Sequence, residues 1–244
     1  MALAFVSRYS GDDFREIFHW MWSSMGLMKG LGRRHGSGKA FCGSAVVLLA
    51  LSPMASAPVS AVELSPSQAA LYTTVSIYPP SASSMTVCYG FVCRRRETLD
   101  FTAADRRALT TILAAGRASA AAERAAVQKA VIWFDRRMGP VIGTDKRVAK
   151  ADFRYFDDKH NFDCWDTTRN TTSLLLVLQE WGLFKYHVVG NPHYRGNALV
   201  LQTPHNTAVL VEKATKVEWV VDLWPRGYAQ PPDVMTVEKW VTED

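Results

Sequence analysis

The chain has 244 residues, 48% of them hydrophobic and 21% charged, which fits one globular domain with or without an appendage. Residues 1–61 hold six of the 28 basic and three of the 23 acidic residues, so the remainder carries a net charge of +2. Nucleic-acid binding depends on a strongly basic surface, so with this charge balance we do not expect nucleic-acid binding.

The first 61 residues have the features of a secretory signal peptide. A basic stretch at 33–39 precedes an apolar run at 40–51, and small residues follow this run. This order is typical of export signals, and we expect cleavage after Ala57 or Ala61. The apolar run is shorter than the roughly 20 residues that span a bilayer. We therefore expect no stable membrane anchor after cleavage; an uncleaved anchor is the alternative.

The residues before the basic stretch make this signal unusually long, so we expect the true start at Met25 or Met28. An exported chain of this kind is predicted to be periplasmic or secreted.

Residues 62–98 are predicted to form an extended arm or linker, because 62–87 are rich in Ser and Pro and weakly patterned. Cys88 and Cys93 follow, with Gly90 between them to help a turn. An oxidising compartment favours a local disulfide between these cysteines. They could instead form half of a metal site, but no second ligand pair with suitable spacing follows. We expect no metal and no cofactor.

Two helices are predicted next. Thr102 and Asp105 have the spacing of a helix start. Residues 119–138 place apolar side chains on one helical face, and Gly139 with Pro140 is expected to end this helix.

The strongest helical pattern covers residues 166–182. Its leucines and Trp181 share one wide apolar face, and Gly182 fits the C-terminal cap. Asp163 or Cys164 lies where this helix begins, and Asp163 is a suitable N-cap.

After Gly182 the pattern changes to short runs rich in Val, Tyr and Trp. We expect antiparallel strands at 184–189, 198–202, 207–212 and 217–224, followed by a loop and a final short element. The predicted fold class is therefore α+β: N-terminal helices, a cysteine-bearing helix, then an antiparallel sheet packed on it.

Cys164 is the odd cysteine once Cys42 leaves with the signal and Cys88 pairs with Cys93. Such a cysteine in an exported protein is either an intermolecular partner or a reactive thiol. Its position at a helix N-terminus favours the thiolate, while charged aspartates on both sides would oppose it.

A reactive thiol needs a base and a group that orients the base. His205 lies immediately before an apolar strand, where it can project toward the head of the helix. Asp222 interrupts the next apolar strand and needs a partner if it is buried. We therefore predict a Cys164, His205, Asp222 triad.

This order carries a family resemblance. The segment "FDCWDTTRNTTSLLLVLQEWG" resembles the "GDC-x-D … L … G" segment of bacterial transglutaminase-like cysteine proteinases, although Phe162 stands where the family usually has glycine. "HNTAVLV" resembles their "HAVL" strand, and "EWVVDLW" the "W-x-x-D-x-W" strand of transglutaminase cores. The resemblance covers roughly residues 120–244 and implies a transglutaminase-like, papain-like peptidase domain at 99–244.

The resemblance implies a thiol hydrolase. The Cys164 thiolate would attack an amide carbonyl to give a thioester, with His205 transferring protons and Asp222 holding its tautomer. The backbone N–H of Cys164 would stabilise the oxyanion. A second donor is expected among three neighbours: Asn161, His160 and Trp165.

The predicted function is hydrolysis of protein or peptide amides in the envelope or surroundings of a bacterium. If a lysine amine replaces water as the acceptor, the reaction becomes protein cross-linking. A binding or structural protein of the cell envelope, with a packed thiol on the same fold, is the other alternative.

Overall fold

The computed structural model describes residues 63–196 and 203–243. The predicted signal peptide and the strand expected at 198–202 lie outside these residues. The described elements are α2 (Pro66–Thr73), β1 (Ser84–Tyr89), β2 (Arg95–Asp100), α3 (Ala103–Ala114), α4 (Ala120–Ile142), a 3-10 turn (Phe153–Tyr155), α5 (Cys164–Glu180), β3 (His187–Val189), β4 (His193–Arg195), β5 (His205–Glu212), β6 (Glu218–Asp222), β7 (Asp233–Thr236) and α6 (Val237–Thr242).

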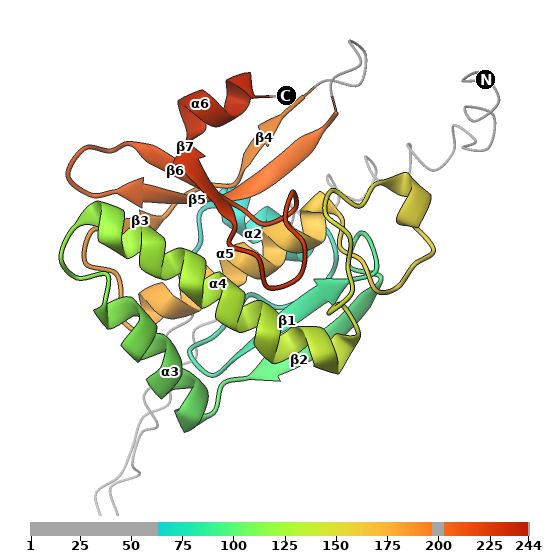
Figure 1. The fold of residues 1–244 in the computed structure, drawn as a ribbon, viewed down its shortest axis with the longest axis horizontal. Coiled ribbons are helices and arrows are strands. Elements are labelled where there is room, and N and C mark those ends of the chain that lie inside the picture. The colour runs from blue at the N-terminus through green and yellow to red at the C-terminus, as the bar shows by residue number, and fades with distance from the viewer. Residues whose placement is uncertain (1–62, 197–202, 244) are drawn as a thin grey trace, which may run out of the picture. The chain divides into compact units, whose positions relative to one another are not determined.

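The architecture is α+β, which confirms the predicted class. β1 and β2 form an antiparallel hairpin, and an antiparallel sheet has the order β3-β5-β6-β7, with β4 also pairing with β5. The register of the two central strands places Ala208 opposite Val221. Figure 1 shows this sheet with α6 at one end.

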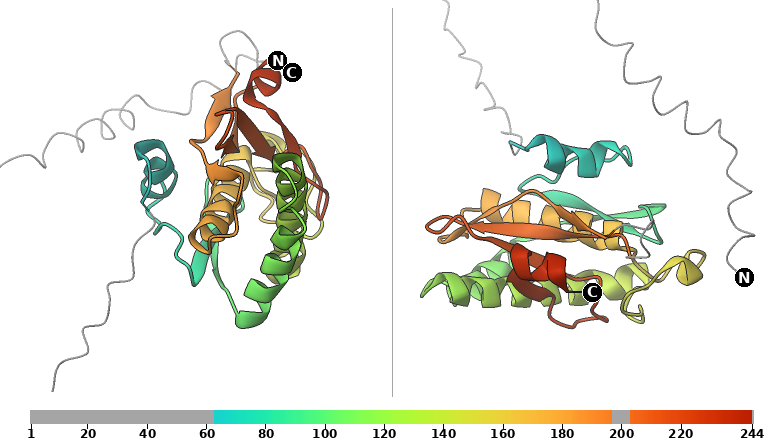
Figure 2. Two further views of the ribbon diagram at one scale, coloured as in Figure 1. Left: turned by 90° about the vertical axis from the view of Figure 1, so that its left-hand side faces the viewer. Right: turned by 90° about the horizontal axis from the view of Figure 1, so that it is seen from above.

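Helix α5 lies at the centre of the fold. It contacts β1 on one side and β3, β5 and β6 on the other, and α4 packs against it. Figure 2 shows α2 and α4 on opposite sides of α5. As a result, every residue from Asp166 to Leu178 is buried.

The bounds of α5 follow from its caps. The Asp163 carboxylate accepts the backbone N–H of Asp166, so the helix begins at Cys164, two residues earlier than the apolar pattern indicated. It ends before Gly182, whose φ of +68° is the left-handed conformation that glycine adopts readily. The predicted glycine cap is therefore confirmed.

Helix α4 runs to Ile142 and does not end at Gly139-Pro140, so that prediction is wrong. Pro140 removes a hydrogen bond to the carbonyl of Arg136, but both residues are exposed, so water can replace the lost donor. Gly139 is buried, and a Cβ there would lie 2.4 Å from a ring atom of Tyr228. This glycine therefore serves close packing, not helix termination.

The expected extended arm at 62–98 is also corrected. Ser65 and Gln68 form a capping box that starts α2, with Pro66 at the first helical position. β1 pairs with β2 and buries Met85 and Val87 in the core. The Ser- and Pro-rich composition reflects a helix start and turns, and the segment is part of the domain.

The sheet contains strands that the sequence did not indicate. β3, β5 and β6 overlap the predicted strands at 184–189, 207–212 and 217–224, and α6 is the expected final short element. β4 and β7 were not predicted. β7 lies in the tail expected to be a loop, where its backbone pairs with β6.

A buried ion pair fixes the loops around this core. The Arg147 guanidinium donates to both carboxylate oxygens of Asp135 on α4, at 2.9 and 2.7 Å. The backbone N–H of Ala229 donates to the same carboxylate at 3.0 Å. The side chains of Arg147 and Asp135 are 1% and 2% exposed, so removal of one partner leaves the other without compensation.

We predict that Asp135→Asn lowers the free energy of unfolding by about 3–5 kcal/mol, because the Arg147 charge then stays buried and unpaired. Urea unfolding followed by circular dichroism measures this. The matched control is Asp157→Asn, whose side chain is 98% exposed and 3.9 Å from Arg94. It should change stability by less than about 0.5 kcal/mol. Equal effects of the two substitutions would contradict the structural role of the pair.

Candidate functional site

Cys164 is the first residue of α5 and the one free cysteine among the residues that the structure describes. Its thiol lies beside the backbone N–H of Asn206, the residue after His205. The Thr168 hydroxyl contacts the backbone carbonyls of Cys164 at 2.8 Å and Asn206 at 2.9 Å. The first turn of α5 is therefore tied to the start of β5.

His205 begins β5 and Asp222 ends β6, so two neighbouring antiparallel strands bring them together. His205 Nε2 lies 2.6 Å from Asp222 Oδ2, and both side chains are 3% exposed. A carboxylate only accepts hydrogen bonds, so Nε2 carries a proton, and in the neutral imidazole Nδ1 is the acceptor nitrogen. This Nδ1 is buried and has no hydrogen-bond partner among the described residues.

Two tryptophans enclose the His205–Asp222 pair. Trp240 Nε1 donates to Asp222 Oδ2 at 2.9 Å, and the backbone N–H of Trp224 donates to Oδ1 at 3.3 Å. The rings of Trp224 and Trp240 have their centroids 4.6 and 5.4 Å from that of the imidazole. These contacts fix the carboxylate and limit rotation of His205.

The pair also lines a cavity of about 610 Å³ with Trp224, Met235 and Trp240. Cys164 is not among the residues that line it, and within the described residues no hydrogen bond joins the thiol to His205. The structure thus brings Cys164 to the strand end that carries His205, with the thiol and imidazole not yet engaged.

The resting thiol is protonated at neutral pH. Burial raises the pKa of Cys164 to about 12, and the negative charge of Asp163 raises it further than the Asn206 N–H lowers it. The expectation that the helix N-terminus favours the thiolate is therefore corrected: at this position burial outweighs the helix dipole.

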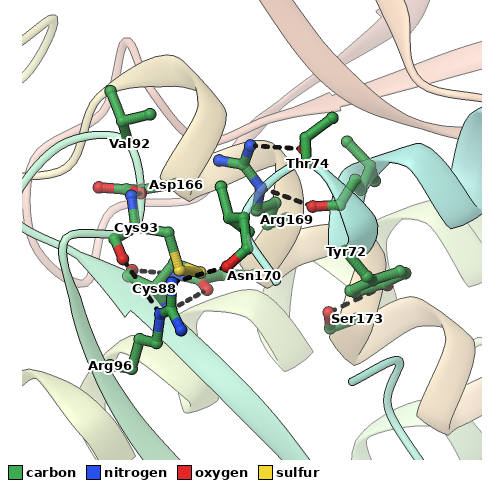
Figure 3. The surroundings of a disulfide bond; sticks show 12 residues. Tyr72, Thr74, Cys88, Val92, Cys93, Arg96, Asp166, Arg169, Asn170 and Ser173 are labelled. Atoms are coloured by element: carbon green, nitrogen blue, oxygen red, sulfur yellow. Dashed lines mark hydrogen bonds between the residues drawn. A yellow bond between two sulfur atoms is a disulfide. The ribbon is translucent and has the colours of Figure 1, made fainter. Parts of the chain in front are cut away.

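The aspartates beside Cys164 bind a loop that the disulfide closes. Cys88 and Cys93 are bonded, as predicted. The backbone N–H of Val92 donates to Asp163 Oδ2 at 2.8 Å. Asp166 accepts the N–H groups of Phe91 at 2.9 Å and Cys93 at 2.7 Å. Figure 3 shows Asp166 beside this loop.

Both carboxyl groups hold protons more tightly than usual. Burial and repulsion from Asp163 raise the pKa of Asp166 to about 8, and burial also raises the pKa of Asp163. The nearby guanidinium of Arg169 and the backbone N–H groups offset only part of this.

The oxyanion candidates are arranged differently from the prediction. The Asn161 side chain is buried, accepts the N–H of Val148 at 2.8 Å and donates to Asp158 at 2.8 Å. We therefore drop Asn161 as an oxyanion donor, since its amide holds the preceding loop. His160 bonds to Asp158 at 2.9 Å and packs on Gly143. Trp165 is 40% exposed.

Two other histidines have their own carboxylate partners. His187 is fully buried and bonded to Glu123 at 2.9 Å. His193 lies 3.1 Å from Glu218. Neither is left with the geometry of His205.

Asn206 and Trp240 were not predicted from the sequence as part of the site. The Asn206 amide is buried, and both its nitrogen and its oxygen lack hydrogen-bond partners among the described residues. A polar residue directly after the predicted histidine was the available signal. Trp240 gave none, because its helix was expected only as a final short element.

Within 63–196 and 203–243 no group of three or more His, Cys, Asp or Glu residues could hold a metal ion. In the same residues no helix has the length and hydropathy needed to cross a membrane. Comparisons with family models, with curated proteins and with solved structures find no match to the chain.

The raised pKa of Asp166 predicts how stability depends on pH. Between the ordinary value of 3.8 and about 8, the folded protein keeps a proton that the unfolded chain releases. The free energy of unfolding should therefore fall as pH rises through this window. In Asp166→Asn this contribution disappears, so the slope between pH 5 and pH 8 should flatten.

Urea unfolding at several pH values measures the slope. Asp166→Asn should also be less stable at pH 5 by about 1–3 kcal/mol, because an amide cannot accept two N–H donors as well as a carboxyl group does. The exposed Asp100→Asn serves as the control and should keep the slope of the parent. An unchanged slope in Asp166→Asn would contradict the prediction.

Proposed function

We propose that the protein is an exported cysteine peptidase or amidase with a transglutaminase-like core, acting through Cys164, His205 and Asp222. The observation that carries the proposal is the state of His205. Its Nε2 is held by a buried carboxylate at 2.6 Å, and its bare Nδ1 is buried without a partner. This is the tautomer that accepts a proton from a nucleophile.

A protonated thiol supports activation by a general base during attack, and not a preformed ion pair. His205 Nδ1 takes the thiol proton as the sulfur of Cys164 bonds to the amide carbon. The imidazolium that forms is stabilised by Asp222. His205 then gives the proton to the leaving amine, and a thioester to Cys164 remains.

Water completes the reaction. His205 takes a proton from the water that attacks the thioester, and the thiol leaves with that proton. The oxyanion of each tetrahedral intermediate would accept the backbone N–H of Cys164 at the helix start. The backbone N–H of Asn206, which lies beside the thiol, is the second donor we favour.

The compartment is part of the same proposal. The Cys88–Cys93 disulfide supports folding in an oxidising environment, as for a periplasmic or secreted protein. Protein or peptide amides are the substrate class, because the resemblance of the helix and both strands is to peptidases.

A binding or structural protein on this fold is the second candidate. It is favoured by the raised pKa of the thiol, and by the missing hydrogen bond between Cys164 and His205. In that case His205 and Asp222 form a buried structural pair, and Cys164 is a packed thiol.

The two candidates differ in an acylation experiment. p-Nitrophenyl acetate offers an activated acyl group, and synthetic peptides offer amides. We expect an acetyl adduct on Cys164 by mass spectrometry, labile to hydroxylamine, and peptide cleavage that Cys164→Ala lowers by about a thousandfold or more. His205→Ala should lower both reactions similarly, because the general base is lost.

His193→Ala is the matched control, since it removes a histidine that is paired with a carboxylate outside the site. It should leave acylation and cleavage unchanged. Absence of the adduct from the folded parent, or equal cleavage by Cys164→Ala, would refute the enzyme proposal and favour the binding protein.

Addition of a primary amine such as cadaverine decides between hydrolysis and cross-linking. We expect the free acid as the main peptide product, because water is the default acceptor unless the site excludes it. A product that carries the amine as its main form would instead indicate the acyltransferase.

A further inference from the structure

The loop that follows β1 has an unusual backbone. Gly90, Phe91, Val92 and Cys93 have φ values of +73°, +67°, +50° and +56°. For residues other than glycine the left-handed conformation costs roughly 1–2 kcal/mol each. Such a run persists only where the surroundings hold it, and here the Cys88–Cys93 disulfide closes it.

This conformation turns three successive N–H groups toward the same side, as in an anion-binding nest. All three meet the carboxylates of Asp163 and Asp166. Asp163 has two tasks at once, because its other oxygen accepts the N–H of Asp166 at 2.7 Å and so caps α5. The loop and the first turn of the cysteine helix therefore share the same acceptors.

The helix also fixes the other end of the loop. The Asn170 amide accepts the N–H of Cys88 and donates to its carbonyl, both at 2.8 Å. Figure 3 shows Asn170 and Asp166 reaching the loop from successive turns of α5. Gly90 donates to the carbonyl of Asn161 at 2.9 Å, just before the helix starts. The loop is thus hydrogen-bonded to the beginning of α5 at several points.

We propose that the disulfide-closed loop 90–93 is the positioning element of Cys164, which holds the first turn of α5 through Asp163 and Asp166 and keeps the thiol in its buried place. This role matters for catalysis only if the proposed function is right, because Cys164 is the nucleophile there. Its test depends on the loop geometry alone.

Opening of the disulfide would break the hydrogen bonds from the loop to Asp163 and Asp166. A dithiol reductant would supply two electrons: its thiolates displace the two sulfurs in turn, leaving Cys88 and Cys93 as thiols and the dithiol as a cyclic disulfide. The strained loop then relaxes, and Asp163 and Asp166 lose three donors. The helix start frays and Cys164 becomes solvated. Since burial is the largest cause of its raised pKa, that pKa should fall toward the ordinary value of about 8.5.

The test follows iodoacetamide alkylation of the Cys164 peptide by mass spectrometry against pH, on the full chain. Cys88 and Cys93 are 0% and 1% exposed, so substitution opens the loop more reliably than reductant. In Cys88→Ser/Cys93→Ser we expect alkylation at pH 8 at least about tenfold faster than in the parent, with a midpoint near 8.5.

Val92→Gly is the matched control. It keeps the disulfide and the Val92 N–H, removes a side chain that is 51% exposed, and suits the positive φ. Its alkylation should stay within about twofold of the parent. If the double variant does not fold by circular dichroism, Asp166→Asn replaces it, with the disulfide intact and the same direction of change expected.

An unchanged rate in the folded double variant would overturn the proposal, and so would an equal rise in Val92→Gly. The outcome is independent of peptidase activity. A parent that cleaves no peptide refutes the proposed function, while the alkylation profile still reports whether the loop positions Cys164.

Discussion

The fold depends on one constraint: α5 is buried on all sides although its first half is polar. Asp166, Asn170 and their neighbours cannot reach bulk water, so each needs a partner inside the protein. Asp166 finds its donors in the backbone of the loop between β1 and β2, and the Asn170 amide bonds to the backbone of Cys88 in β1. On another side, the Arg169 guanidinium donates to the carbonyl of Leu71 in α2 at 2.7 Å. The N-terminal hairpin and α2 therefore supply hydrogen-bond partners for the buried polar groups of the central helix.

The same constraint shapes the proposed site. Asp163 caps the helix start, and its charge works against a thiolate at Cys164. Burial and the charge of Asp163 together leave the thiol protonated. The Trp240 and Trp224 contacts to Asp222 then serve to keep His205 in one tautomer and one orientation.

The sequence alone predicted the features that depend on a local residue pattern or on a buried charged group that requires a partner. The leucines of α5 gave its helix, and Asp222 in an apolar strand gave the pairing with His205, because a buried acid requires a partner. The partners of Asp163 and Asp166 could not be predicted, since they are backbone N–H groups some 70 residues earlier, at a separation of 71 for Val92. No residue type marks a backbone donor. Asn161 was misjudged for a similar reason: its amide partner Val148 contributes only its main chain.

The bare Nδ1 of His205 separates the two candidate functions in physical terms. A buried acceptor without a donor costs about 1–3 kcal/mol, and a purely structural His205–Asp222 pair gains nothing from bearing that cost. A general base needs this free acceptor. On the proposed mechanism, the nitrogen gains a donor when the thiol rotates toward it, and again when water arrives. On the same proposal, the backbone N–H of Asn206 beside the thiol is the donor that the oxyanion would meet. On the proposed function, His205 Nδ1 is therefore a base that meets its proton donor only during turnover, whereas a structural pair would leave it without one.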